Sequence, residues 1–256
     1  MVTEPAQPRL DPVRARELKL PSERDWERAA VLEPEPGPRH PKLISDGGGL
    51  PFGPAALAGT PEPLDAEDPA AGALLEHLLR RGAPKRLRWR RGATPSAPER
   101  PSLDDWRQLA RTDDEVLFGR GLPPRMLTAS LRRTGRRGTW TFLGSSAARP
   151  LRATRDGIRA SSWRLDPMHE AQVDEKILRV LVTEQAFASG RPAHGRVLAP
   201  EIYLDDGELV LTIFITPQPG YQNGTPNPET PLRIAIPDPV GTRRLIDGAL
   251  VELRPA

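Results

Sequence analysis

The strongest hydrophobic pattern of the chain lies between Lys176 and Pro217. Within it, 177–183 (ILRVLVT) is a run of mostly aliphatic residues, which is typical of a strand buried on both faces. From Glu208 to Thr216 apolar residues take every second position, which predicts a strand with one face in a core. A turn signal, Asp205-Asp206-Gly207, joins this strand to 201–204 as a hairpin. We expect much of the C-terminal half to pair with these strands.

Shorter strand patterns surround this centre. The segments 126–133 (MLTASLRR) and 139–144 (TWTFLG) predict a hairpin, because both are strand-like and the turn-forming TGRRG lies between them. LRAT and IRASSWRLD flank Asp156-Gly157, a dipeptide typical of a type I′ turn. Further strands are predicted at 232–236 and near the end of the chain. The fold is therefore predicted to be mainly β, with an antiparallel β-sandwich or barrel-like C-terminal domain and a Pro-rich, partly helical N-terminal region.

Helical signals occur in the first half of the chain. Ser22 and Asp25 have the spacing of a capping box, and Trp26 would give the short helix behind them an apolar side. We expect Trp26 to anchor an otherwise extended arm onto the core. A second helix is predicted from Asp68-Pro69, an N-cap followed by a proline at the first helical position, to Gly82. Its lone His77 has no metal-binding partner one turn away.

Three further segments of this half carry local signals. Ser102 is predicted to cap a third helix that ends near Arg111, with Leu103, Trp106 and Leu109 on one face. The segment 117–124 (LFGRGLPP) is expected to be a loop. Another loop is expected at 46–54 (DGGGLPFGP), because it lacks the ending of a phosphate-binding motif and no strand pattern precedes it.

Composition divides the chain. It has 31 Pro and 22 Gly in 256 residues, and its hydrophobic fraction is 37%. The prolines are dense in the first 63 residues, where each removes a backbone donor and restricts the residue before it. We therefore predict a Pro/Gly-rich extended arm at 1–63 that is partly disordered. A small helical and basic segment is predicted at 64–111, and a β-sandwich-like domain at 112–256.

The net charge of +3 is unevenly distributed. From Arg80 to Arg100 there are eight basic residues and one acid, Glu99. Part of this segment alternates basic and apolar residues, so it could neutralise phosphates and stack a base of single-stranded nucleic acid or bind another polyanion. The residues of this polyanion-binding hypothesis are Lys85, Arg86, Arg88, Trp89, Arg90 and Arg91. The alternative is an edge strand whose arginines discourage aggregation, or a segment docked on the chain's own acidic half.

Several classes of site and location are disfavoured. Without cysteine the chain has no disulfide, no thiolate metal site and no cysteine nucleophile, and we expect neither a metal nor a cofactor. No stretch of about 18 apolar residues could span a bilayer as a helix. The first twenty residues lack the apolar run of a signal peptide, so the expected location is cytoplasmic, unless the true start of the protein lies upstream.

No catalytic motif stands out. The only hydrolase candidates are Ser189, His194 and Glu184, and no G-x-S-x-G sequence accompanies them. A non-catalytic binding or interaction module is favoured, because long loops on a sandwich suit recognition. A protein is the favoured partner. The candidate residues for binding it are Phe187, Arg191, His194, Tyr221, Gln222 and Asn223.

A resemblance covers about residues 115–249. It rests on VLFGRGLPP, TWTFLG, IRASSWRLD, VLVTEQAFASGR, PQPGYQNGTPNPETPLRIAI and RRLIDGA. These segments resemble the C-terminal β domain of uncharacterised actinobacterial (high-GC) proteins that look secreted or lipoprotein-like. Such relatives often carry cysteines where this chain has Phe187 and Gly224. The resemblance thus implies that the two loops meet in space, with Phe187 close to 221–226 and filling the place of the sulfur.

Overall fold

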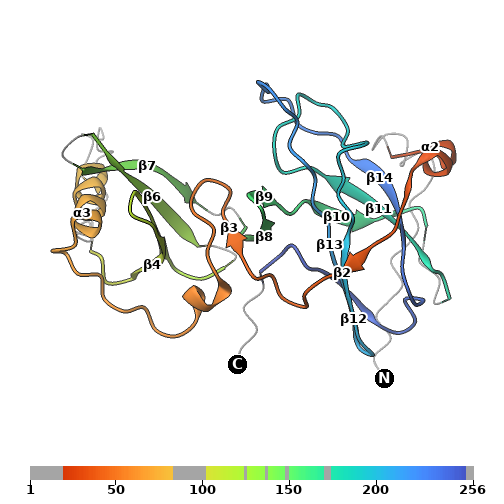
Figure 1. Cartoon of the computed structure of the whole chain (residues 1–256), viewed down its shortest axis with the longest axis horizontal. Helices are drawn as coiled ribbons and strands as arrows, with labels where there is room; N and C mark the ends of the chain where they lie inside the picture. Colours follow the sequence, from red (N-terminus) through yellow and green to blue (C-terminus); the bar gives the residue numbers. More distant parts are fainter. Residues whose placement is uncertain are drawn as a thin grey trace, which may run out of the picture. The chain divides into compact units, whose positions relative to one another are not determined.

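The computed structural model of the chain describes residues 20–82, 102–123, 126–135, 138–147, 150–169 and 174–251. It is mainly β, with several sheets and few helices, as predicted (Figure 1). Its contacts form two compact units. Unit 1 holds the described residues up to 41 and from 153 to 249, and unit 2 holds those from 42 to 152 and from 250. This division cuts through both the predicted arm, 1–63, and the predicted domain, 112–256.

Unit 1 is a β-sandwich-like unit with two four-stranded sheets. One has the order β1-β14-β11-β10 and the other β15-β13-β12-β2. The first sheet consists of β1 (Val31–Leu32), β14 (Thr230–Ala235), β11 (Ile177–Thr183) and β10 (Ser162–Leu165). The second consists of β15 (Arg244–Asp247), β13 (Glu208–Thr212), β12 (Glu201–Leu204) and β2 (Glu35–Pro36). The unit also contains the hairpin of β8 (Arg152–Arg155) and β9 (Ile158–Arg159), apart from Arg152, the first residue of β8, which belongs to unit 2.

The core of unit 1 lies between the two sheets. Alternate residues of β11 and β14 pack there against the predicted apolar face of the β13 segment. These core residues include Leu178, Val180, Val182, Leu232, Ile234, Leu209, Leu211, Ile213 and Ile215. Antiparallel pairing joins β10, β11 and β14 as well as β12 and β13. The pairs β1–β14, β2–β12 and β13–β15 are parallel, which the antiparallel prediction did not include.

Two of these parallel strands come from the N-terminal arm. The helix α2 (Glu23–Arg28) starts as predicted, with the backbone N–H of Ser22 donating to Asp25 Oδ2 at 2.8 Å. Trp26 is 2% exposed and packs on Leu181, on the face of β11 that points away from the sandwich core. Both expectations are confirmed, because Trp26 anchors the arm and β11 is buried on both faces.

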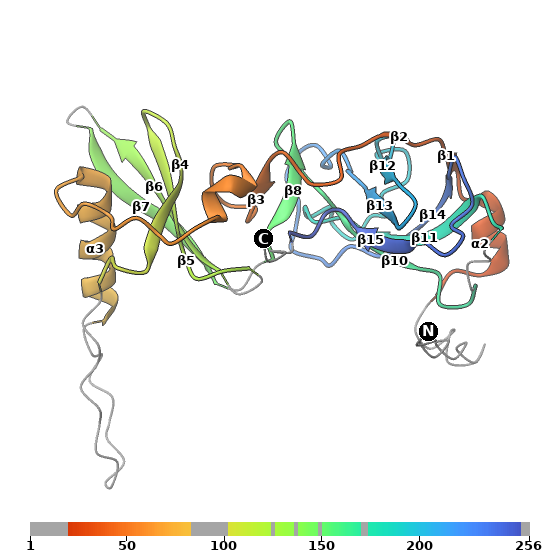
Figure 2. The same ribbon diagram turned by 90° about the horizontal axis from the view of Figure 1, so that it is seen from below.

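Unit 2 has a single antiparallel sheet with the order β4-β5-β6-β7. Its strands are β4 (Trp106–Arg111), β5 (Glu115–Arg120), β6 (Leu127–Thr134) and β7 (Thr139–Ala147). The helix α3 (Pro69–Gly82) covers one face of this sheet (Figure 2). The other face packs on the segment that contains β3 (Ile44–Ser45) and the short 3-10 helix η1 (Pro54–Leu57).

Local signals explain several element boundaries and turns that were predicted correctly. The N-cap of α3 is Asp68, whose Oδ1 accepts from the backbone N–H of Ala70 at 2.8 Å. The 126–144 hairpin forms as predicted. In unit 1 the Asp156-Gly157 turn has positive φ at both residues, 49° and 76°, as a type I′ turn requires.

Two predictions in unit 2 were wrong. The segment 102–111 is not a helix, since strand β4 begins at Trp106. Trp106 packs on the α3 side of the sheet and Leu109 on the other, so their spacing of three reflects two covered faces of a strand. The segment 117–124 is not all loop, because its first four residues belong to β5. Only after Arg120 does the chain leave the sheet.

Candidate binding surface

Two long loops of unit 1 lie against each other. The first loop, 184–200, joins β11 to β12, and the second loop, 216–229, leads into β14. Asn227 of the second loop bridges them. Its Oδ1 accepts from the backbone N–H of Ala188 at 2.9 Å, and its Nδ2 donates to the carbonyls of Glu184 at 3.2 Å and Ala186 at 2.5 Å. One side chain of the second loop therefore fixes three residues of the first.

A second bridge runs through Ser189. Its hydroxyl donates to Gln222 Oε1 at 2.8 Å and accepts from the backbone N–H of Asn223 at 3.1 Å. The amide nitrogen of Gln222 donates to the carbonyl of Pro219 at 2.9 Å. Proline has no backbone donor, so a loop dense in prolines needs side-chain amides and hydroxyls to satisfy its carbonyls. The Asn, Gln and Ser residues of these loops therefore hold the two loops together.

A buried ion pair holds the base of the first loop. Glu184 is 6% exposed, and its two carboxylate oxygens accept from Arg196 at 2.7 and 2.6 Å. Arg196 Nη1 also donates to the carbonyl of Thr216, at the start of the second loop, at 2.8 Å. The hydrogen bond with Glu184 holds the pKa of Arg196 above its usual range. A bidentate guanidinium–carboxylate contact of this kind restricts both side chains to one geometry.

This frame presents aromatic side chains to solvent. Phe187 is 59% exposed and Tyr221 is 95% exposed, although both lie in loops that are otherwise hydrogen-bonded to each other. Arg191 and His194 of the first loop are exposed as well. Exposed aromatics on a rigid frame can bury a large area at low cost in conformational entropy, which is typical of recognition surfaces.

The six predicted binding residues have different roles. The structure brings the two loops together, as expected, but Gln222 and the backbone of Asn223 serve the frame. His194 lines a hollow of about 630 Å³ together with residues of the arm such as Arg28 and Ala29. The residues that lock the loops, Asn227 and Arg196, were missed. Their only signal was indirect, namely the lack of backbone donors in a proline-dense loop.

The prediction that the Phe187 side chain fills the place of the sulfur was wrong. This side chain does not fill a space near 221–226, since more than half of it is exposed. A Cβ atom placed on Gly224 would meet no other heavy atom within 4 Å beyond its own neighbours. The loops meet instead through Ala188, Ser189 and Asn227. Polar contacts occupy the junction, and the aromatic ring stays at the surface.

The hydrolase candidates are held in separate interactions. Glu184 is bound to Arg196, Ser189 donates to Gln222 and not to a histidine, and His194 faces the hollow beside the arm. This arrangement lacks the serine-to-histidine hydrogen bond that activates a nucleophile. The residues of the polyanion-binding hypothesis, 85–91, lie outside the described residues.

Two other kinds of feature are absent from the described residues. Within them, no three His, Cys, Asp or Glu side chains gather in a way that could hold a metal ion. In the same part of the chain, no helix has the length and apolar character needed to cross a membrane.

Comparison with known proteins gives no match, whether with family models, with curated sequences or with solved structures.

Proposed function

We propose that the protein is a non-catalytic binding module and that its two-loop surface contacts a protein partner. The observation that carries the proposal is the combination of a locked frame with exposed aromatics. The frame consists of the Asn227 bridge, the Ser189–Gln222 hydrogen bond and the Glu184–Arg196 ion pair. Phe187 and Tyr221 are the aromatic groups that this frame holds toward solvent.

The energetics of association favour this reading. Binding costs free energy when flexible loops must be ordered, and a loop that is already hydrogen-bonded avoids much of that cost. Aromatic side chains are also among the residues that contribute most to protein interfaces. Exposed Arg191 would complement acidic groups at the edge of the partner's surface.

The resemblance to secreted or lipoprotein-like actinobacterial proteins remains part of the proposal, and so does the cytoplasmic location. That family has no established activity, so it supplies no ligand. The proposal of a protein partner therefore rests on the loop geometry alone.

The test is a double variant, Phe187→Ser with Tyr221→Ser. A partner captured by affinity purification is identified, and its affinity for the purified protein is measured by calorimetry. Two interface aromatics of this kind should weaken binding about 30-fold or more. The matched control is Leu143→Ser, which removes an exposed apolar side chain of unit 2, 49% exposed, and should leave the affinity unchanged.

Two outcomes would contradict the proposal. One is equal affinity of the double variant and the unmodified protein for the partner. The other is binding to heparin or an oligonucleotide that weakens steeply with salt and is lost when Arg86, Arg88, Arg90 and Arg91 are replaced. That result would favour the polyanion-binding alternative.

A further inference from the structure

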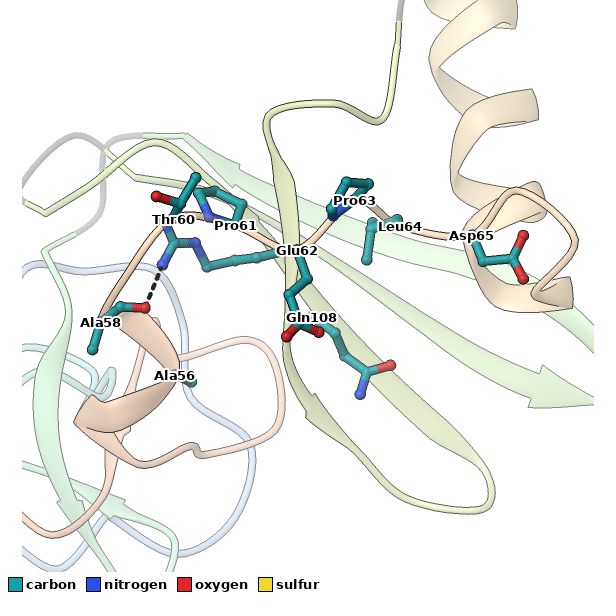
Figure 3. A pocket seen from close by; sticks show the side chains of 10 residues that line it. Ala56, Ala58, Thr60, Pro61, Glu62, Pro63, Leu64, Asp65 and Gln108 are labelled. Atoms are coloured by element: carbon teal, nitrogen blue, oxygen red, sulfur yellow. Dashed lines mark hydrogen bonds between the residues drawn. The ribbon is translucent and has the colours of Figure 1, made fainter.

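Unit 2 contains a cavity of about 440 Å³ (Figure 3). One wall is the segment 56–65, which begins in the last two residues of η1, and the other is β4, through Arg107 and Gln108. This volume lies in the range of about 300–1,000 Å³ in which small-molecule sites are found. Figure 3 shows the polar side chains of Thr60, Glu62, Asp65 and Gln108 along it.

A buried arginine side chain lines this cavity. Arg107 is 8% exposed, and its Nη1 donates to the carbonyl of Leu57 at 2.9 Å, with Gly59 O further away at 3.4 Å. The carbonyl of Leu57 lies at the C-terminal end of η1, so the guanidinium also caps that short helix. Arg107 has no carboxylate within 4 Å among the residues that the structure describes.

Most of the donors of this guanidinium are unused. Its Nε is buried and has no hydrogen-bond partner, and Nη2 donates to no described residue. A guanidinium has five N–H donors, and a buried one is normally paired with a carboxylate or fully hydrogen-bonded. An unpaired guanidinium that lines a cavity is therefore suited to a carboxylate that enters from solvent.

Two acidic side chains line the same cavity. Glu62 and Asp65 are exposed, and neither forms an ion pair with Arg107. Both carboxylates would repel a simple anion in this cavity. A ligand that carries an ammonium group besides its carboxylate would be attracted both by Arg107 and by the acidic side chains. Gln108 and Thr60 can donate to or accept from such a ligand.

We propose that this cavity binds a small zwitterion of the free α-amino acid class. The carboxylate of the ligand contacts Arg107, and its ammonium group contacts Glu62 or Asp65. This site lies in unit 2, so it is separate from the two-loop surface of unit 1 and does not depend on the function proposed for that surface.

The experiment is a calorimetric titration of the whole protein with a panel of free L-amino acids. Propionate and propylamine serve as probes that carry only one of the two charges. We expect at least one amino acid to bind, and each single-charge probe to bind about tenfold or more weakly than it, since each lacks one of two charge contacts. Absence of binding by every amino acid at millimolar concentration would overturn the proposal, and so would propionate binding as tightly as the best amino acid.

Variants of the charged side chains test which group of the ligand each one contacts. The double variant Glu62→Gln with Asp65→Asn should lose affinity for the amino acid and gain affinity for propionate, because the repulsion is gone. The matched control is Glu67→Gln, an exposed acid two residues after Asp65 that does not line the cavity, and it should change neither affinity. Arg107→Lys should abolish binding of both, and if this variant fails to fold, the Glu62 and Asp65 variants still decide. Unchanged amino acid affinity in the double variant would refute the assignment.

Discussion

The two units of this protein cover their sheets in different ways. In unit 1 two sheets face each other, and the core lies between them. In unit 2 a single sheet has α3 on one face and the segment of β3 and η1 on the other. Strands of both units nevertheless bury consecutive residues. In β13, Leu209 and Leu211 pack into the sandwich core and Val210 between them is also buried. In β5, Val116 and Phe118 pack on the α3 side and Leu117 on the other side.

A chain poor in apolar residues can thus bury its sheets by covering them with distant segments, either a second sheet or a helix and a loop segment. Unit 1 also completes its sheets with the arm, which adds the two-residue strand β1 to one sheet and β2 to the other. Ion pairs accompany this arm, such as Arg179–Glu23, Arg155–Glu35 and Arg39–Glu208. Exposed ion pairs contribute little free energy, so the burial of Trp26 and the backbone hydrogen bonds must hold the arm.

Among the variants considered, replacement of Trp26 is expected to lower the free energy of unfolding most. Trp26→Ala removes a side chain that is 2% exposed and leaves the outer face of β11 at Leu181 open. We expect the free energy of unfolding to fall by about 3–5 kcal/mol, as measured by urea denaturation. The arm should also become sensitive to limited proteolysis.

The matched control for Trp26 is Arg179→Gln. It removes the ion pair with Glu23 and the guanidinium that lies 5.7 Å from the ring centre of Trp26, but keeps the buried ring. The expected loss is below about 1 kcal/mol. Similar losses for the two variants would mean that electrostatic contacts, and not the burial of Trp26, hold the arm.

The next largest loss of unfolding free energy is expected when a buried carboxylate of unit 2 is removed. Asp46 is 2% exposed and accepts from the backbone N–H groups of Gly48 at 2.9 Å and Gly49 at 3.0 Å, and from the hydroxyl of Thr128. Because Thr128 is in β6, this contact ties the covering segment to the sheet. Asp46→Ala leaves these donors unpaired and should lower the free energy of unfolding by about 2–3 kcal/mol in urea denaturation.

The control for Asp46 is Asp206→Ala in the β12–β13 turn of unit 1. Asp206 is exposed, and the turn is formed by its neighbour Asp205, whose Oδ1 accepts from the N–H groups of Gly207 and Glu208 at 2.8 Å. The expected change at Asp206 is within about 0.5 kcal/mol. If Asp46→Ala proved equally mild, the covering segment of unit 2 would owe its position to apolar packing alone.

The smallest expected effect concerns pH. His77 of α3 stacks on Phe142 of β7, with ring centres 3.5 Å apart. Burial, and secondarily Arg81 and Arg80, hold the pKa of His77 below its ordinary value of 6.5. The unfolded chain therefore binds this proton more readily, so the free energy of unfolding should fall as the pH decreases below about 6.5. His77→Phe keeps a stacked ring without a charge and should flatten the pH dependence between pH 7 and 5 in urea denaturation.

The control for His77 is His194→Gln in unit 1, which replaces an exposed histidine and should leave that slope in place. A slope that is unchanged in His77→Phe, or lost in His194→Gln, would mean that another group titrates in this range.

Signals that span a few residues were readable from the sequence. The capping box at Ser22, the N-cap at Asp68 and the turns at Asp156-Gly157 and Asp205–Gly207 all form as predicted, because each depends on local backbone geometry. The segment 102–111 shows the limit of this reading. Apolar residues at a spacing of three fit one face of a helix and also two faces of a strand, and the partners that cover those faces lie far away in the chain.

The candidate site divides in the same way. Sequence pattern pointed to the two loops and to candidate binding residues on them. Only the tertiary structure decided that Asn227 and Arg196 lock the loops, that Phe187 faces solvent and that Arg107 is buried beside a cavity without an ion pair to any described carboxylate. Local preferences act along the chain, whereas burial and charge pairing depend on which distant segments pack together.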